Sequence, residues 1–167
     1  MDVFLVRHAL AQERDAEKWP DDRARPLKPS GIRRFRSIAR GLARLATAPD
    51  VVWSSRLARA WHTAVILHEE AAWPEPEACT LIEEELDPAR VLRAIARAGA
   101  IERLAIVGHA PGLDDLAATA VLGPRRNGLM RLRKGGVACL RFEPRPGPGA
   151  AELLWLASPT LLRAADE

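Results

Sequence analysis

The sequence holds only two cysteines, Cys79 and Cys139, and no C-x-x-C pair. Because they lie in separate apolar segments, we expect two buried thiols in a reducing compartment. No apolar run approaches the roughly 20 residues that a membrane-spanning helix needs. The first residues, MDVFLVRH, lack both the basic start and the long apolar stretch of a signal peptide. We therefore expect a cytoplasmic protein that does not bind a membrane.

Signatures of nucleic-acid and nucleotide binding are also missing. The net charge is only +3, and no basic run is interleaved with aromatic residues. Many of the arginines lie within amphipathic stretches such as GIRRFRSIARGLARL at 31–45. This placement is typical of the solvated face of a helix. Neither G-x-x-x-x-G-K-[ST] nor G-x-G-x-x-G occurs. We expect no nucleic-acid partner and no nucleotide fold of those two types.

What remains is a pattern of alternating strands and helices. The chain has 167 residues, of which 48% are apolar and 28% are charged. This size and composition suit one domain spanning residues 1–167. Short apolar runs predict strands at 3–6, 51–53, 79–82 and 104–107, and helical spacing predicts helices at 29–45, 57–70, 88–98 and 111–122. Residues 137–142 and 152–156 form a predicted antiparallel hairpin around PRPGPG. The predicted fold class is α/β: a single-domain three-layer α/β/α sandwich with a mostly parallel central sheet.

Three of the predicted strands end in residues suited to chemistry. Arg7 and His8 follow the first, Arg59 comes soon after the second, and His109 follows the fourth. Taken singly, each has a structural explanation: a strand-end pair, a solvated helix arginine, a helix cap. In parallel sheets, however, ligands bind outside the carboxyl ends of the strands. We therefore expect these side chains to meet at one edge. His62 and His68 lie inside a helical pattern and are interpreted as surface or packing residues.

Two histidines among several arginines favour phosphate chemistry. Arginine matches phosphate oxygens with paired donors and stays charged. An imidazole beside a phosphate so held can attack phosphorus and form a phosphoenzyme. A metal site is the competing interpretation, but it needs a third ligand and the arginines would repel a cation. We expect neither a metal nor a cofactor.

Three segments resemble the histidine phosphatase superfamily, which includes the phosphoglycerate mutases. They are VRHA at 6–9, with Ala9 in the family's glycine position, SSRLARAWHTA at 54–64, and VGHAPGL at 107–113. In the second segment Arg56 stands at the family's proline and His62 at its glutamine. The resemblance implies a phosphoglycerate mutase-like fold. It also implies that His8 is the nucleophile and that Arg7, Arg59 and His109 complete a phosphate pocket.

Within that superfamily, DDRARPLKPSG at 21–31 is similar to a segment of phosphohistidine phosphatases of the SixA type, with Lys28 replacing a threonine that would cap the next helix. By this resemblance Arg25 approaches the phosphate or the substrate, although a salt bridge within the loop is an equally good interpretation. Glu85 and Asp87 are the candidates for a general acid, and Glu84 remains a third. The chain has no room for the helical insertion of the mutases.

The resulting hypothesis is a metal-independent phosphatase that works through phosphohistidine and releases inorganic phosphate. Imidazole leaves a phosphoramidate more readily than an alkoxide leaves an ester, so a site with a weak acid favours phosphohistidine in a protein. The alternatives are a phosphatase of small phosphorylated metabolites such as sugar phosphates or nucleotides, and a phospho-ligand binding module without catalysis. A mutase, which needs a more enclosed site, is disfavoured.

Overall fold

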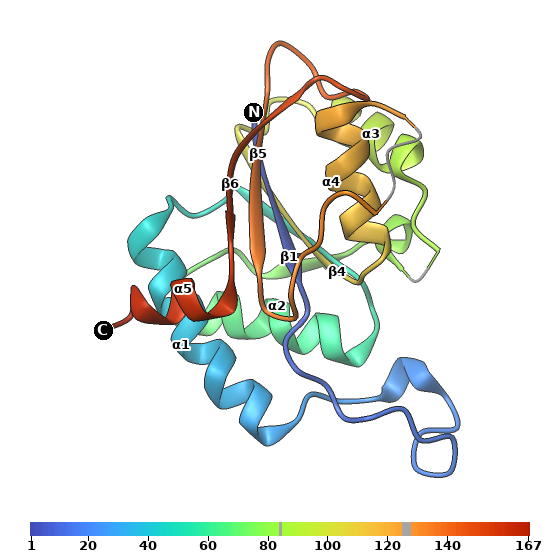
Figure 1. Ribbon diagram of the computed structural model, residues 1–167, viewed down its shortest axis with the longest axis vertical. Coiled ribbons are helices and arrows are strands. Elements are labelled where there is room, and N and C mark those ends of the chain that lie inside the picture. Colours follow the sequence, from blue (N-terminus) through green and yellow to red (C-terminus); the bar gives the residue numbers. More distant parts are fainter. Residues whose placement is uncertain (84, 125–127) are drawn as a thin grey trace.

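Strands and helices alternate along most of the chain in a computed structural model that describes residues 1–83, 85–124 and 128–167 (Figure 1). Within these residues the strands are β1 Asp2–Arg7, β2 Val51–Ser54, β3 Pro76–Ala78, β4 Arg103–Gly108, β5 Val137–Phe142 and β6 Ala151–Ala157. The helices are α1 Pro29–Leu45, α2 Ala58–Ala71, α3 Pro88–Arg97, α4 Gly112–Leu122 and α5 Pro159–Ala164. Two short 3-10 turns, η1 Asp22–Ala24 and η2 Thr80–Ile82, complete the elements.

In the described residues, all six strands belong to one sheet, in the order β3-β2-β4-β1-β5-β6. The pairs β3–β2, β2–β4 and β4–β1 are parallel, because a helix or a long connection returns the chain between them. Strand β5 lies antiparallel to β1, and β6 antiparallel to β5. The predicted α/β fold, mostly parallel with an antiparallel edge, is confirmed.

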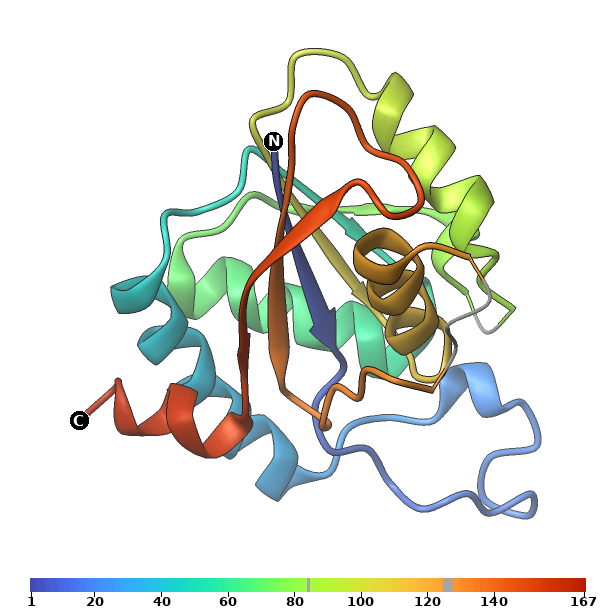
Figure 2. The same cartoon turned by 45° about the horizontal axis from the view of Figure 1, so that its top comes forward.

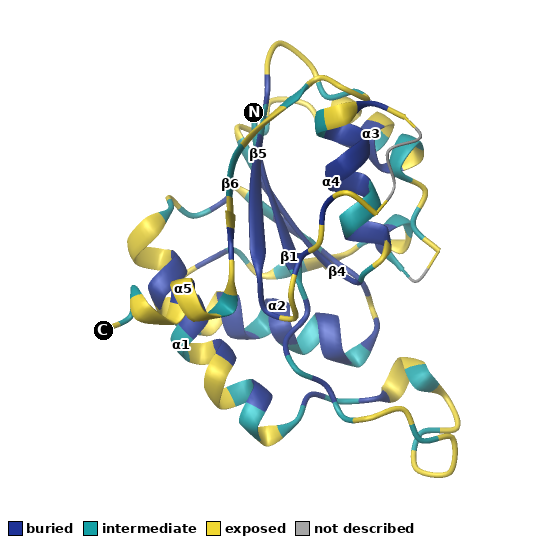
Figure 3. Ribbon diagram, viewed as in Figure 1, coloured by how far each residue is buried: buried dark blue, intermediate teal, exposed yellow. Residues whose placement is uncertain are grey.

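The sheet is covered on both faces, as the continuous apolar runs of its strands indicate. Alternate residues of β1 point to opposite sides. Phe4 and Val6 join the core formed with α1, α2 and α5. Val3 and Leu5 join the core formed with α3 and α4. Figures 1 and 2 show the two groups of helices on either side of the sheet, and Figure 3 shows its central strands buried throughout.

The strand predicted at 79–82 is wrong. Strand β3 ends at Ala78, and residues 80–82 form the turn η2. The Cys79 N–H still donates to the Ser54 carbonyl at 2.9 Å, but the Ile82 N–H turns back to the Cys79 carbonyl at 3.2 Å. The Ile82 side chain is fully buried against the sheet. A short apolar run predicts burial but does not distinguish a strand from a buried turn.

Helices α1 and α5 differ in how their first turns are capped. Lys28 precedes α1 and provides no side-chain cap, in agreement with the sequence, and its ammonium instead pairs with Glu13 at 2.6 Å. Helix α5 was not predicted. It begins with Ser158, whose hydroxyl accepts a hydrogen bond from the Leu161 N–H at 3.3 Å, followed by Pro159 in the first turn. A serine cap followed by proline is typical of the start of a helix. Helix α5 is too short to show the helical periodicity on which the predictions depend.

In residues 1–83, 85–124 and 128–167, no helix is both long enough and apolar enough to cross a membrane.

Leu5 tests the packing of the central strand. Its side chain is fully buried in β1, so Leu5→Ala should lower the free energy of unfolding by about 2–5 kcal/mol through lost contacts and the remaining cavity. The control is Leu161→Ala on α5, where the side chain is 59% exposed and the expected change is within about 0.5 kcal/mol. Urea unfolding measures both. Equal effects of the two substitutions would contradict this description of the core.

Candidate active site

The carboxyl ends of three parallel strands meet because β4 lies between β1 and β2. Arg7 pairs with Gly108, and Ser54 pairs with Val107. The backbone continues this register past the strands, since the His8 N–H donates to the Gly108 carbonyl at 3.0 Å. The rings of His8 and His109 consequently lie side by side, with centroids 5.2 Å apart.

A cavity of about 350 Å³ opens at this edge. Its lining residues are Arg7, His8, Arg14, Arg25, Arg59, His109, Ala110, Pro111 and Lys134. The structure thus brings together both histidines and all three arginines that the sequence singled out. Arg14 and Lys134 add two cations that no sequence pattern indicated. No carboxylate belongs to this lining among the described residues, so the cavity is suited to an anion.

His8 is held in a nucleophilic form. Its Nδ1 lies 2.7 Å from the Ala9 carbonyl oxygen. Because a carbonyl only accepts, Nδ1 carries the proton and Nε2 keeps its lone pair. Burial lowers the pKa of His8 to about 3, helped by the charges of His109, Arg59 and Arg7 and opposed by the bond to Ala9. The imidazole is therefore neutral at neutral pH, as attack on phosphorus requires.

His109 is neutral for the same reason. Burial lowers its pKa to about 4, and the charges of Arg59, Arg25 and Arg7 add to the effect. Its Nε2 lies 2.9 Å from the hydroxyl oxygen of Ser55. That hydroxyl accepts from the Leu57 N–H at 3.2 Å and has its own proton to donate to Nε2, which leaves the ring proton of His109 on Nδ1. Its Nδ1 is buried and meets no hydrogen-bond partner within the described part of the chain. A phosphate oxygen in the cavity is the type of partner that would satisfy it.

Asp22 organises the buried arginines from outside the cavity lining. One carboxylate oxygen lies 2.7 Å from Arg25 Nε, and the other lies 3.2 Å from Arg59 Nη1. Arg59 Nη1 also donates to the Asp22 carbonyl at 2.9 Å. The hydrogen bond from Arg25 holds the pKa of Asp22 below its usual value. Arg25 forms the salt bridge within the loop and also lines the cavity, so its approach to a phosphate or substrate stays a prediction. Sequence reasoning missed Asp22, although a carboxylate three residues before Arg25 was visible.

Arg7 is oriented through the backbone of Leu132. Arg7 Nη1 donates to the Leu132 carbonyl at 2.6 Å, and the Leu132 N–H donates to Asp114 Oδ1 at 2.9 Å. The same loop closes over β1 at Gly135, whose N–H lies 3.0 Å from the Arg7 carbonyl. Gly135 has φ +78°, a conformation that favours glycine. Asp114 on helix α4 therefore holds the backbone of Leu132, which in turn orients the Arg7 side chain.

Ala9 fits its place without strain. In the described residues outside glycine, only Ala72 has a positive φ, so residue 9 does not require the glycine found at that place in the resembling family. The Ala9 N–H donates to the Thr63 hydroxyl at 3.0 Å, and this hydroxyl donates to the Arg59 carbonyl at 2.6 Å. Thr63, which the sequence analysis did not single out, thus connects the segment after His8 to the helix that carries Arg59.

Two of the carboxylates proposed as general acid, Glu85 and Asp87, do not line the cavity. Glu85 is exposed and does not line it. Asp87 caps helix α3, accepting from the Ala89 N–H at 2.9 Å and the Arg90 N–H at 3.3 Å. Glu84 lies outside the described residues. A catalytic role for Glu85 or Asp87 therefore finds no support in the geometry, because one faces solvent and the other stabilises a helix.

Metal binding has no evident ligand set. In residues 1–83, 85–124 and 128–167, no three side chains of His, Cys, Asp or Glu are grouped so that they could hold a metal ion.

The lowered pKa values predict an unusual titration. In the unliganded protein, the imidazole NMR signals of His8 and His109 should not shift between pH 8 and about 5.5, because both pKa values lie near 3–4. Inorganic phosphate should raise both pKa values, since a bound anion favours the imidazolium. His8→Asn and His109→Asn variants assign the signals. Protonation of either ring with a midpoint near the ordinary value of about 6.5 would contradict the burial described.

Asp114→Ala tests the support of Arg7. The substitution leaves the buried Leu132 N–H without an acceptor, so the free energy of unfolding should fall by about 1–3 kcal/mol. Titration calorimetry should show weaker binding of inorganic phosphate because Arg7 loses its fixed orientation. Asp114→Asn keeps an acceptor oxygen at the same position and should restore most of the affinity. Wild-type phosphate affinity in the alanine variant would show that Arg7 is oriented without Asp114.

Solved structures share this fold over nearly the whole chain. The protein histidine phosphatase SixA in complex with tungstate superposes with a TM-score of 0.80 at 22% identity, covering 96% of this chain and 98% of that one. A putative SixA from Agrobacterium tumefaciens gives 0.75 at 21%, covering 94% and 97%. A putative alpha-ribazole-5'-P phosphatase from Escherichia coli gives 0.73 at 17%, covering 96% and 98%. At these identities the likeness shows the fold.

Sequence comparison identifies the family. An uncharacterized protein of Picosynechococcus sp. is 29% identical over 147 residues, which cover 84% of this chain and 85% of that protein. The profile of the histidine phosphatase superfamily (branch 1) matches residues 3–86, half of the chain, which include His8, Arg25 and Arg59. The chain therefore belongs to the histidine phosphatase superfamily, and we class it as a phosphatase.

Proposed function

We propose that this phosphatase hydrolyses phosphohistidine in a protein, without a metal, through a phosphohistidine intermediate on His8. The observation that carries the proposal is the cavity itself. It places an imidazole nitrogen with a free lone pair among buried guanidinium groups, and its described lining contains no carboxylate. Its likeness in fold to SixA, a protein histidine phosphatase solved with the oxyanion tungstate, supports the same substrate class.

In the first step, His8 Nε2 attacks the phosphorus of the substrate. A P–N bond forms to His8 as the substrate's P–N bond breaks, and the electron pair of the broken bond stays on the departing ring. Arg7, Arg25 and Arg59 neutralise the phosphoryl oxygens as charge develops. The proton on His8 Nδ1 stays where the Ala9 carbonyl holds it, so the phosphorylated ring carries a positive charge that aids its later departure.

In the second step, water attacks the phosphorus on the side opposite to His8. The P–N bond breaks, its electron pair returns to Nε2, and His8 is again neutral with its proton on Nδ1. Both protons of the water remain on the product, which leaves as dihydrogen phosphate and then ionises. His109 lies beside the ring of His8 and can donate a hydrogen bond to a phosphoryl oxygen in both steps.

The lining favours a leaving group that needs no acid. A departing alkoxide must be protonated, and a carboxylic acid is the usual donor. A phosphohistidine whose second ring nitrogen carries a proton departs instead as a neutral imidazole. Among the described residues, Asp22 pairs with Arg25 and Arg59 and has a lowered pKa, so it is a poor proton donor.

The same arginines disfavour a divalent cation as the activating group. Four guanidinium groups and Lys134 line the cavity with the histidines, and their repulsion opposes a cation at that place. The reaction as written needs no cofactor. A cytoplasmic location stays a prediction from the sequence.

Trapping the phosphoenzyme tests this proposal. Phosphoramidate labelled with ³²P should leave acid-labile phosphate on wild-type protein but not on His8→Ala. The turnover of phosphohistidine should fall by roughly a thousandfold or more in that variant, because the nucleophile is gone. His62→Ala is the matched control, since His62 lies on helix α2 outside the cavity. Peptide mapping locates the phosphorylated residue.

Comparison of substrates decides the class. Phosphohistidine peptides should have a higher kcat/KM than sugar phosphates, nucleotides and simple alkyl phosphates. Equal or faster turnover of the esters would show a phosphatase of small metabolites. Vanadate binding without turnover of any substrate by the wild-type protein would show a binding module.

A further inference from the structure

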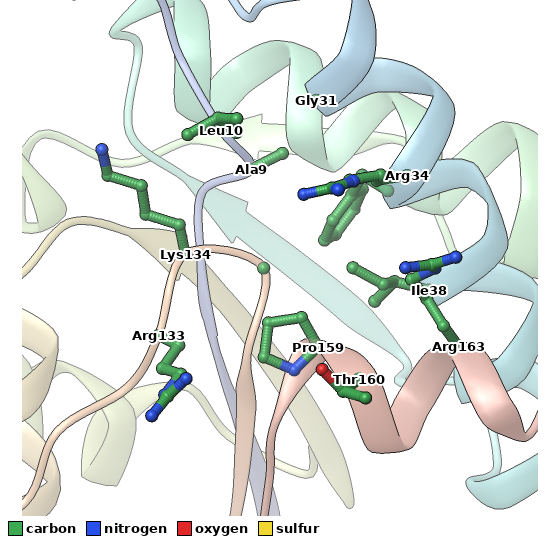
Figure 4. A pocket seen from close by; sticks show the side chains of 12 residues that line it. Ala9, Leu10, Gly31, Arg34, Ile38, Arg133, Lys134, Pro159, Thr160 and Arg163 are labelled. Carbon is green, nitrogen blue, oxygen red and sulfur yellow. The ribbon is translucent and has the colours of Figure 1, made fainter.

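A second cavity of about 270 Å³ lies beside the one that holds the histidines (Figure 4). Its lining residues are Ala9, Leu10, Gly31, Arg34, Phe35, Ile38, Arg133, Lys134, Gly135, Pro159, Thr160 and Arg163. These come from the segment after β1, from α1, from the loop before β5 and from the start of α5. Lys134 lines both cavities, so the second one, here called the basic cavity, adjoins the active site.

The floor of the basic cavity is apolar. The partly exposed Leu10 and Pro159 line it (Figure 4), and Phe35 and Ile38 on α1 are buried beneath the surface. Two glycines mark close approaches in its wall. A Cβ at Gly31 would collide with the Leu10 carbonyl, and a Cβ at Gly135 would lie 3.2 Å from Ile38. Larger residues at these two places would therefore strain the packing of the wall.

The rim carries four exposed cations, which are Arg34, Arg133, Lys134 and Arg163. None of these side chains forms an ion pair with another described residue, and no described carboxylate lines the cavity. Arg40 on α1 differs, because it pairs with Glu70 at 2.8 Å and with Asp166 at 2.9 Å. The basic cavity therefore retains a net positive field next to the active site.

This arrangement differs from that of a second phosphate pocket. In the active site, the side chains of Arg25 and Arg59 are only 11% and 4% exposed. Around the basic cavity all four cations project from an apolar floor into solvent. An apolar centre with a charged rim is the anatomy of a protein–protein interface. Exposed charges mainly steer an oppositely charged partner and select its orientation.

We propose that the basic cavity docks an acidic segment of the phosphoprotein substrate, with one apolar side chain of that segment against Leu10 and Pro159. The inference rests on the proposed function, because it requires a protein substrate whose phosphohistidine enters the adjoining cavity. Lys134 gives the continuity, since it contacts both spaces.

The test uses two synthetic phosphohistidine peptides of equal length, each with one leucine, in which four glutamates of the first are replaced by glutamines in the second. Phosphoramidate is the small substrate. The variant is R34E with R163E, two residues outside the active-site lining. The matched control is R33E with R93E, which makes the same change in net charge at exposed arginines outside both cavities.

At low salt, kcat/KM for the glutamate peptide should fall by roughly tenfold or more in R34E/R163E. The glutamine peptide and phosphoramidate should be hydrolysed as by the wild-type protein, and the control should change little. The loss should shrink as salt is added, because exposed charges are screened. Equal kcat/KM of both peptides with the wild-type protein, or equal losses in the variant and its control, would overturn the proposal.

Failure of the proposed function is recognised separately. If the wild-type protein hydrolyses neither phosphohistidine peptides nor phosphoramidate, the catalytic proposal fails by itself. Fluorescence anisotropy of the unphosphorylated, labelled glutamate peptide then decides on docking. Binding that R34E/R163E weakens and R33E/R93E retains supports the basic cavity as the docking site, and binding that is absent or equal in all three proteins overturns it.

Discussion

Everything at the active site depends on the parallel pairing of β4 with β1 on one side and with β2 on the other. The pairing aligns Arg7 with Gly108 and Ser54 with Val107, so three chain segments leave the sheet at the same level. Side chains on the first residues beyond the strands are then neighbours without any long loop to position them. A slip of one residue between β1 and β4 would send one of the two histidines to the opposite face.

The positive charge of the arginines around His8 and His109 is the second constraint on the site. Burial of the two histidines acts in the same direction on their pKa values. Removing His8 and His109 from water lowers both pKa values, and the guanidinium groups lower them further. The arginines can remain close together because Asp22 compensates two of them from behind, outside the cavity lining. The cost of this arrangement is acid sensitivity. Unfolded histidines take up protons near pH 6.5 and the folded ones do not, so stability falls as the pH falls below that value.

The fold and most of the residues of the candidate site could be predicted from the sequence. The residues that orient them, such as Asp22 and Asp114, could not. The apolar runs of β1, β2 and β4 are periodic local signals, and the residues after them were visible at once. The turn at 80–82 was missed because its burial is decided by packing against the sheet. Asp114 and Lys134 act across about a hundred residues or more of chain, so no local pattern could connect them to Arg7 or His8.

By itself, the sequence indicated which residues to propose for the chemistry and that they follow parallel strands, because strand periodicity and side-chain type are properties of short segments. The tertiary structure alone decided which nitrogen of His8 is free, which carboxylate pairs with the arginines, and that Glu85 lies apart from them. It also decided that four unpaired cations gather beside the active site. Hydrogen-bond partners, burial and charge proximity arise between segments that are distant in the chain, and they exist only once those segments are packed together.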